Sequence, residues 1–233
     1  MCVNIVIYCI LYKHTAQLAA AQNAQFKIRV IYGFFHTGKS RKNMPHFIVP
    51  LPTFMENVKI KDKTFKVYLN NSQIQTEIQR LAGEINARCA GKKVTFLPVL
   101  SGSFLFFADL IKHIKVEHEI YFVKYKSYSG TDSTGIVDAM LPPPASIKGT
   151  TAIIVEDIVD TGTTLKTIVP DVQKSGPDAV KICSLLLKPD KYDFAFSVDF
   201  TGFEIENDFV VGYGLDYDEA GRNLRHIYKL TNS

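Results

Sequence analysis

The sequence lacks the features of several protein classes. No run of apolar residues reaches the roughly 18 that a membrane-spanning helix needs, so no membrane role is expected. The four cysteines form no C-x-x-C pair, which argues against a zinc site and against a disulfide framework. A cytoplasmic location, where thiols stay reduced, is the simplest expectation. We find no internal repeat and no low-complexity tract.

Acidic residues are absent from the first 55 positions, which hold six lysines and arginines. The whole chain has 27 Lys and Arg and 23 Asp and Glu, so the rest carries 21 cations against 23 anions, a formal charge of −2. The net charge of +4 therefore comes from the N-terminal segment. A body near neutrality favours a small-molecule substrate over nucleic acid, whose phosphates attract basic surfaces.

Residues 1–54 read as an extension to a domain at 55–233. Met1–Tyr12 is apolar but has no positive charge before it, so it would make a poorly formed secretory signal. A basic stretch without acids also resembles an organelle transit peptide. We favour a third interpretation, in which the working protein starts at Met55 and the upstream segment is dispensable or spurious.

The extension contains one motif of its own. Gly33–Ser40 matches the P-loop pattern G-x-x-x-x-G-K-S. The pattern binds phosphate only when a helix follows, because the helix N-terminus completes the cradle. Pro45, Pro50 and Pro52 would end such a helix. We interpret the match as chance, with a P-loop nucleotide-binding protein that uses Lys39 as a rival hypothesis.

The body alternates between helical and extended patterns. A capping box at Ser72 and Gln75 predicts a helix start, and Gly91 predicts its end. Phe104–Ile114 is apolar enough for a core helix, and a further helix is expected around Leu165–Val172. The predicted strands are Val94–Leu100, Glu119–Lys124, Thr151–Val155, Ala179–Leu187, Phe209–Tyr213 and Ile227–Leu230. This alternation predicts an α/β domain with a parallel sheet flanked by helices.

Residues 153–165, IIVEDIVDTGTTL, carry the strongest functional pattern. An apolar strand ends at two carboxylates, a short loop follows, and a helix begins. Ligands of open parallel sheets bind beyond the carboxyl ends of the strands. The unpaired N–H groups of a helix start, a glycine and three threonine hydroxyls would form a cradle for a monophosphate. The residues assigned to it are Ile158, Val159, Asp160, Thr161, Gly162, Thr163 and Thr164.

Carboxylates at this position suit sugar and metal chemistry. Glu156 and Asp157 could bind the hydroxyls of a ribose or a hydrated Mg²⁺ ion. Asp160 lies between the expected diol and phosphate positions, where it could move a proton at the group that joins or leaves the sugar.

The run resembles the phosphoribosyl-pyrophosphate signature of type I phosphoribosyltransferases, and most specifically that of the hypoxanthine-guanine enzymes. The resemblance covers most of residues 55–233. It implies a parallel sheet flanked by helices with a small hood built from terminal segments. It also implies purine salvage, Mg²⁺ as cofactor, purine bases and phosphoribosyl pyrophosphate as substrates, and a homodimer or homotetramer.

The resemblance assigns further residues. Ser101 and Gly102 lie in a segment similar to the pyrophosphate loop, which often contains a non-proline cis peptide. Ser127 and Tyr128 match a Ser-Tyr pair that, in the family, belongs to a loop that closes as a lid over the reacting centre. Arg222 matches an arginine that holds pyrophosphate, and Asp216 joins Glu156 and Asp157 as a Mg²⁺ ligand.

The purine is assigned to two segments by the same resemblance. Lys188 would donate to the exocyclic oxygen of the base. Asp208, Phe209 and Val210 resemble the purine clamp, in which Phe209 stacks on the base and the main chain of Val210 pairs with its edge.

The sequence departs from this pattern at three positions. Relatives commonly have lysine where this chain has Ser101 and Thr163, and arginine where it has Lys124. These changes leave the chemistry possible but put base preference in doubt. Two rivals share the fold. One is a phosphoribosyltransferase for xanthine or a pyrimidine, and the other is a regulator that senses phosphoribosyl pyrophosphate and binds nucleic acid.

Overall fold

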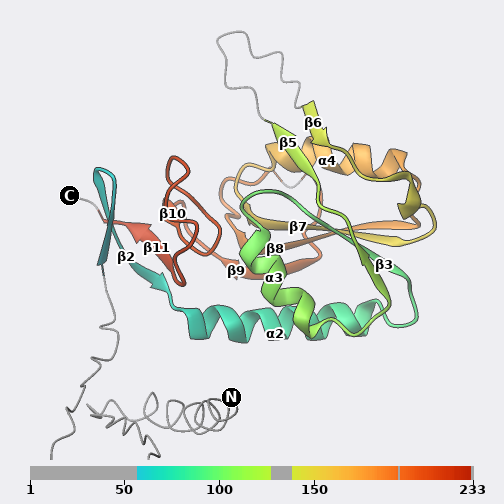
Figure 1. The fold of residues 1–233 in the computed structure, drawn as a ribbon, viewed down its shortest axis with the longest axis horizontal. Coiled ribbons are helices and arrows are strands. Elements are labelled where there is room, and N and C mark those ends of the chain that lie inside the picture. The colour runs from blue at the N-terminus through green and yellow to red at the C-terminus, as the bar shows by residue number, and fades with distance from the viewer. Residues whose placement is uncertain (1–56, 127–137, 194, 232–233) are drawn as a thin grey trace, which may run out of the picture. The chain divides into compact units, whose positions relative to one another are not determined.

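The computed structural model describes residues 57–126, 138–193 and 195–231 (Figure 1). The N-terminal extension 1–54, its P-loop-like segment and the predicted lid residues Ser127 and Tyr128 lie outside this part. In the part of the chain that is described, no helix is long and apolar enough to cross a membrane.

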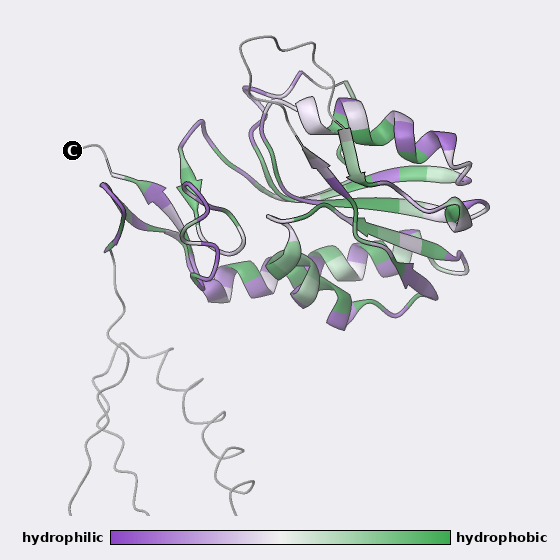
Figure 2. Cartoon of the chain, turned by 45° about the horizontal axis from the view of Figure 1, so that its top comes forward, coloured by the Kyte–Doolittle hydropathy of each residue, from purple (hydrophilic) through white to green (hydrophobic). Residues whose placement is uncertain are grey.

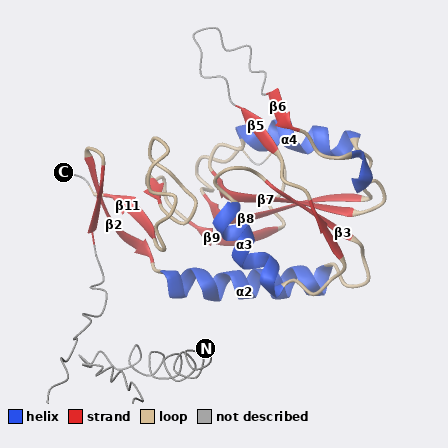
Figure 3. Ribbon diagram, in the orientation of Figure 1, coloured by secondary structure: helices blue, strands red, loops and turns tan. Residues whose placement is uncertain are grey.

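The centre of the fold is a parallel sheet of five strands in the order β4-β3-β7-β8-β9 (Figure 3). All four neighbouring pairs run parallel, as the alternation of strands and helices predicts. Parallel strands bring their carboxyl ends to one edge, where ligands bind. The strands are β3 (Val94–Pro98), β4 (His118–Ile120), β7 (Thr151–Val159), β8 (Ala179–Leu187) and β9 (Phe200–Glu204).

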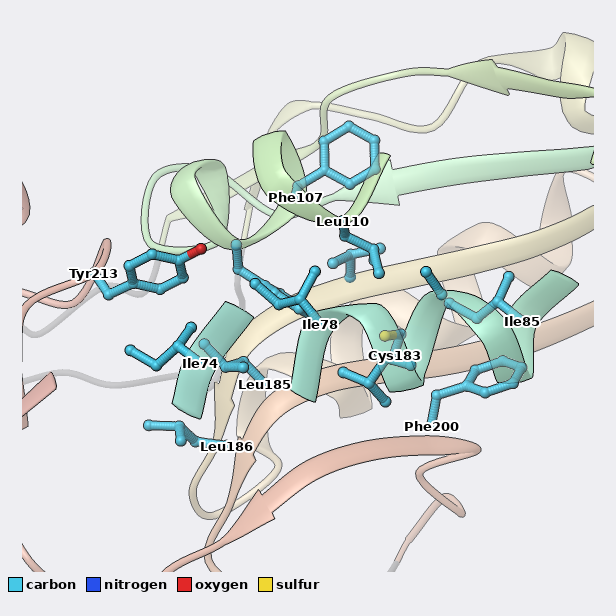
Figure 4. Packing of buried hydrophobic residues seen from close by; sticks show 14 of the residues in the cluster. Ile74, Ile78, Ile85, Phe107, Leu110, Cys183, Leu185, Leu186, Phe200 and Tyr213 are labelled. Atoms are coloured by element: carbon cyan, nitrogen blue, oxygen red, sulfur yellow. The ribbon is translucent and has the colours of Figure 1, made fainter. Parts of the chain in front are cut away.

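Helices cover both faces of this sheet. α2 (Asn71–Arg88), α3 (Phe104–Leu110) and the 3-10 turn η1 (Ile111–His113) lie on one face, and α4 (Thr163–Lys174) lies on the other (Figure 1). The apolar stripes of the helices turn inward (Figure 2). The strands supply alternate residues to the two cores: Ile153 and Val155 pack toward α2 and α3, whereas Ala152 and Ile154 pack toward α4. Figure 4 shows the first of these cores, with Ile74, Ile78 and Ile85 of α2 turned toward the sheet.

The predicted start of the first helix is wrong by two residues. Asn70, not Ser72, is the N-cap: its side chain accepts the N–H of Gln73, whose side chain accepts the N–H of Asn70 in return. Gln75 instead reaches across to α3, where it donates to Asp109. The helical turn already includes residues 71 and 72, because the N–H of Ile74 donates to the carbonyl of Asn70 at 3.1 Å.

Other boundaries also differ from the prediction, and the predicted strand Phe209–Tyr213 is observed only at Val210–Val211. β3 ends at Pro98, two residues before the predicted end, although the carbonyl of Pro98 accepts the N–H of Val123 at 3.1 Å and the N–H of Val99 still donates to Val155. The core helix ends at Leu110 and continues as η1. β4 stops at Ile120, and Lys124 opens a separate hairpin, β5 (Lys124–Lys126) with β6 (Asp138–Leu141). A short 3-10 turn, η2 (Ala145–Ile147), leads into β7.

The two ends of the described chain form a second sheet, which we call the terminal sheet. Its antiparallel order is β1-β2-β11-β10. A small core of Ile60, Phe65, Val211 and Tyr228 holds it together. This sheet is the predicted hood. Its strands are β1 (Asn57–Ile60), β2 (Lys63–Leu69), β10 (Val210–Val211) and β11 (Ile227–Leu230).

Candidate active site

The strand β7 carries the two adjacent carboxylates inside the sheet. The prediction that it ends at Val155 is wrong, because Ile158 and Val159 still pair with Leu186 and Leu187 of β8. Glu156 is therefore only 6% exposed, and its Oε1 atom has no hydrogen-bond partner among the described residues. Burial, together with the nearby charge of Asp157, raises the pKa of Glu156 well above its ordinary value.

Asp157 faces the loop that precedes α3. Its Oδ1 accepts the N–H of Ile158 at 3.0 Å. A side chain at Gly102 would overlap the Asp157 carboxylate, so the loop can approach only because position 102 is glycine. Burial raises the pKa of Asp157 to about 6, although backbone N–H groups and Arg222 oppose the shift. The predicted pyrophosphate loop and the predicted diol-binding carboxylate are thus in contact.

The loop between β7 and α4 has the geometry of an anion site. Gly162 is the N-cap of α4 with φ +80°, and the ring of Tyr192 occupies the space that a side chain would need. The hydroxyls of Thr161 and Thr163 lie 2.9 Å apart. These two threonines and Thr164 are exposed beside the first turn of the helix, whose N–H groups have no partners within the helix. The threonine hydroxyls and the helix N–H groups therefore lie together as hydrogen-bond donors on the exposed side of the loop.

Asp160, in the same loop, forms an ion pair with Lys188. Lys188 Nζ lies 2.9 Å from Asp160 Oδ2, and Lys188 is only 5% exposed. The backbone reinforces the pair, since the N–H of Lys188 donates to the carbonyl of Val159. Lys191 Nζ lies 3.6 Å from the other carboxylate oxygen. The sequence pattern placed Asp160 and Lys188 at one site but gave no sign that they pair.

The C-terminal segment brings a cation to the loop at Gly102. Arg222 Nη2 lies 2.9 Å from Asp216 Oδ1, and Arg222 Nη1 donates to the carbonyl of Gly214 at 3.0 Å. Gly214 lies against the carbonyl of Gly102, where a side chain would clash. The peptide bond between Leu100 and Ser101 is cis, as the resemblance implies. Ser101, Gly102, Asp157 and Arg222 therefore belong to one assembly.

The residues predicted to hold the purine come from both sheets. Phe209 is 43% exposed and contacts the rings of Phe65 and Tyr217, with centroids 6.1 and 5.8 Å away. Lys63 Nζ lies 4.4 Å from the centroid of Tyr217 and 5.6 Å from that of Phe209.

The two residues next to Phe209 are held by different contacts. Val210 is buried in β10, and Asp208 pairs with Lys229 at 2.8 Å. No local pattern pointed to Lys63 or Tyr217, because only the pairing of β2 with β11 brings the ends of the chain together.

The carboxylates suit a metal ion that is shared with a substrate. Within 57–126, 138–193 and 195–231, no group of three His, Cys, Asp or Glu residues forms a metal site. Asp216 is engaged by Arg222 and by the N–H of Glu219, whereas Glu156 keeps an unpartnered buried oxygen. Mg²⁺ at phosphate sites usually takes one or two carboxylates and completes its shell with water and substrate oxygens. The residues present fit that arrangement and not a cage made by the protein alone.

Replacing Gly102 with alanine tests the contact between loop and strand. We expect the new methyl group to push against the Asp157 carboxylate, lowering the free energy of unfolding by about 1–3 kcal/mol. Chemical denaturation measures the change. Gly83→Ala is the matched control: Gly83 lies in α2 with open space around it, so alanine should stabilise by about 0.5–1 kcal/mol. Equal effects of both variants would refute the close contact.

Comparisons with known proteins identify the family of the chain. The phosphoribosyl transferase domain family matches residues 65–218. The hypoxanthine phosphoribosyltransferase of Buchnera aphidicola subsp. Schizaphis graminum is 36% identical over 72% of this chain and 96% of its own length. The hypoxanthine-guanine phosphoribosyltransferase of Bos taurus is 37% identical over 70% of this chain and 79% of its own length.

Solved structures lead to the same family. A crystal structure of a hypoxanthine-guanine phosphoribosyltransferase from Bacillus anthracis matches with a TM-score of 0.66 and 35% identity, covering 72% of this chain and 97% of that one. A hypoxanthine phosphoribosyltransferase from Staphylococcus aureus matches with a TM-score of 0.67 and 37% identity, covering 71% and 91%. The chain belongs to the phosphoribosyltransferase family, alongside its hypoxanthine-guanine members.

Proposed function

We propose that the chain transfers the 5-phosphoribosyl group of phosphoribosyl pyrophosphate to hypoxanthine or guanine, giving IMP or GMP and pyrophosphate. The observation that carries the proposal is the loop from Asp160 to Gly162. It joins the carboxylates of β7 to the start of α4, and it holds a carboxylate paired with the buried Lys188. Family membership gives the reaction class, and this loop supplies the groups that the reaction needs.

The ribose 5-phosphate would lie between β7 and α4. The exposed hydroxyls of Thr161, Thr163 and Thr164 and the N–H groups at the start of α4 would bind the phosphate. Glu156 and Asp157 would accept hydrogen bonds from the ribose hydroxyls. The unpartnered oxygen of Glu156 supports this role, because a buried acceptor without a donor is unfavourable until a ligand supplies one.

The pyrophosphate would lie between the loop at Ser101–Gly102 and Arg222. Backbone N–H groups and a guanidinium are both suited to phosphate oxygens. Mg²⁺ held by Asp216, Glu156 or Asp157 would offset the charge that grows on the departing pyrophosphate. Serine at position 101 contributes no positive charge, so Arg222 is the cation that the described residues bring to this loop.

The base would lie between Lys188 and Phe209. The ammonium of Lys188 can donate to a 6-oxo group, and the exposed ring of Phe209 offers a stacking surface beside Tyr217. Asp160 would accept the proton from N7 as N9 attacks the sugar, while its pairing with Lys188 holds the carboxylate in place. Holding both reactants in line would supply much of the rate acceleration.

Four further properties belong to this proposal. We place the enzyme in the cytoplasm as a homodimer or homotetramer; exposed apolar side chains at Ile120, Phe122, Met140 and Leu141 are consistent with a subunit contact. Light scattering coupled to size-exclusion chromatography measures the oligomeric state, and a strict monomer would contradict the proposed homo-oligomer.

We also propose that the catalytic domain is 55–233. Ser127 and Tyr128 remain the predicted lid.

The decisive assay offers four bases with phosphoribosyl pyrophosphate and Mg²⁺. We expect the full chain, and the chain started at Met55, to use hypoxanthine and guanine. Adenine should be rejected by up to roughly 10⁴-fold in kcat/KM, because its 6-amino group would face the ammonium of Lys188 and leave two buried donors unpaired.

Other outcomes would favour the rival functions. Equal use of adenine would refute the role of Lys188, and preference for xanthine would move the enzyme to a neighbouring specificity. No turnover with any base, together with salt-sensitive binding to nucleic acid, would favour the regulator.

A further inference from the structure

A loop with unusual backbone geometry precedes Arg222. Tyr213 has φ +53°, and its neighbours Gly212 and Gly214 have φ +99° and +104°. Glycine adopts these angles readily, but a tyrosine seldom does, so other contacts must hold Tyr213 in place. The ring is 4% exposed and packs in the core that α2 and α3 share.

The hydroxyl of Tyr213 supplies such a contact. It donates to Asp109 Oδ2 on α3 at 2.5 Å and accepts from Gln75 Nε2 on α2 at 3.0 Å. Gln75 also donates to Asp109 at 2.8 Å, and Lys112 pairs with the other oxygen of Asp109. Figure 4 shows the Tyr213 ring reaching from the C-terminal segment with its hydroxyl oxygen toward the helices. Three segments far apart in the sequence thus meet at one carboxylate.

The protonation states keep this arrangement fixed near neutral pH. Burial, and the hydrogen bond to Asp109, raise the pKa of the Tyr213 hydroxyl, so it stays a donor. Burial alone would raise the pKa of Asp109, but hydrogen bonds from Lys112, Tyr213 and Gln75 outweigh it and lower that pKa. The carboxylate therefore stays an acceptor.

The same helix that carries Asp109 begins directly after the loop at Ser101 and Gly102. On the other side, Gly214 follows Tyr213, touches the carbonyl of Gly102 and accepts a hydrogen bond from Arg222. A fixed distance from Tyr213 to α3 therefore sets how Arg222 lies relative to the loop.

We propose that Tyr213 and Asp109 are positioning residues that set the separation between the Ser101–Gly102 loop and Arg222, and thereby the fit of pyrophosphate. The inference rests on the proposed function, in which these two groups hold the pyrophosphate. Neither residue touches the substrate: Tyr213 acts through Gly214, and Asp109 acts through Tyr213.

Tyr213→Phe in the full chain is the first test. It keeps the buried ring and removes the hydroxyl, so we expect the KM for phosphoribosyl pyrophosphate and the Kd for Mg²⁺ pyrophosphate to rise roughly 10-fold. The KM for hypoxanthine should stay within about twofold, since Lys188 and Phe209 are untouched. Tyr228→Phe is the matched control, because it removes the hydroxyl of a tyrosine that is 5% exposed in the terminal sheet, and it should change neither constant.

Variants of Asp109 separate positioning from general stability. Asp109→Asn keeps an oxygen that can accept from Tyr213, so its Kd for pyrophosphate should stay near that of the wild type. Asp109→Leu removes the acceptor and should match Tyr213→Phe. Equal loss in both Asp109 variants, or an unchanged Kd in Tyr213→Phe, would overturn the positioning role.

Calorimetry with inorganic pyrophosphate and Mg²⁺ reads binding without turnover, so the two proposals can fail separately. If the wild type makes no nucleotide and Tyr213→Phe still weakens pyrophosphate binding, the proposed reaction falls and the positioning pair stands. If the wild type makes IMP and the variant binds pyrophosphate normally, the pair falls and the reaction stands. If the wild type does not bind pyrophosphate, both fall.

Discussion

Replacing Asp160 with asparagine is expected to lower kcat by roughly 10²–10⁴-fold with only a small change in the KM for phosphoribosyl pyrophosphate. Asparagine has nearly the same shape, and it keeps one oxygen toward Lys188, but it cannot take a proton from the purine. Steady-state kinetics with hypoxanthine would measure the loss. An unchanged kcat would remove Asp160 from proton transfer and leave it a structural partner of Lys188.

The ion pair offers a second explanation that the experiment must exclude. Without the charge of Asp160, the buried Lys188 could shift and misplace the base. Misplacement of the base should raise the KM for hypoxanthine, whereas loss of proton transfer should lower kcat and leave that KM nearly unchanged. Asp171→Asn, which breaks an exposed pair with Lys174 on α4, controls for loss of a carboxylate and should leave kcat unchanged.

Replacing Glu156 with glutamine should have opposite effects on activity and stability. We expect the ligand-free variant to be more stable by about 1–3 kcal/mol at pH 8, because a buried carboxylate oxygen without a partner is replaced by a neutral amide. We expect kcat/KM to fall, because ribose hydroxyls and a hydrated metal ion prefer the carboxylate. Denaturation and kinetics on the same preparation measure both quantities.

The gain in stability should depend on pH in a defined direction. The pKa of Glu156 is higher in the folded than in the unfolded state, so the folded wild type binds more protons and loses stability as pH rises. The loss begins near the ordinary glutamate pKa of about 4.3 and ends above the folded pKa. Below that window the Glu156 carboxyl is protonated in both the folded and the unfolded wild type, so it is neutral like glutamine. The free energies of unfolding of the wild type and the variant should then converge.

The control is Glu117→Gln. Glu117 is exposed near the start of β4, at the end of the sheet away from the site, and its replacement should leave stability and activity unchanged. A stability difference for Glu156→Gln that did not vary with pH would contradict a buried, ionisable carboxylate. A less stable variant would mean that Glu156 already has a favourable partner.

The sequence predicted those helices and strands whose bounds depend on the residues within them. The apolar run of β8 was predicted with its observed bounds, and the helix after the phosphate loop was expected from the spacing of Leu165, Ile168 and Val172. β7 was predicted too short because Glu156 and Asp157 are polar. Its length is decided by pairing with β8, a non-local contact that no local pattern contains.

In the candidate site, too, the local motif was predicted, whereas the contacts between distant segments were not. The run at residues 153–165 named the carboxylates and the loop, because their order along the chain is itself the motif. The approach of Gly214 to Gly102 and the position of Lys63 over Tyr217 were not foreseen. Both join segments separated by more than a hundred positions, so they follow only once the two sheets are assembled.

The terminal sheet has a consequence for synthesis of the chain. β2 pairs with β11, so residues 65–69 must wait for residues 227–230 before their edge is covered. On the ribosome the parallel sheet can assemble while β2 still presents unpaired N–H and C=O groups, which are open to pairing with another nascent chain. The stacking surface for the base, with Phe209 resting on Phe65, can therefore be completed only after the C-terminal strand has been made.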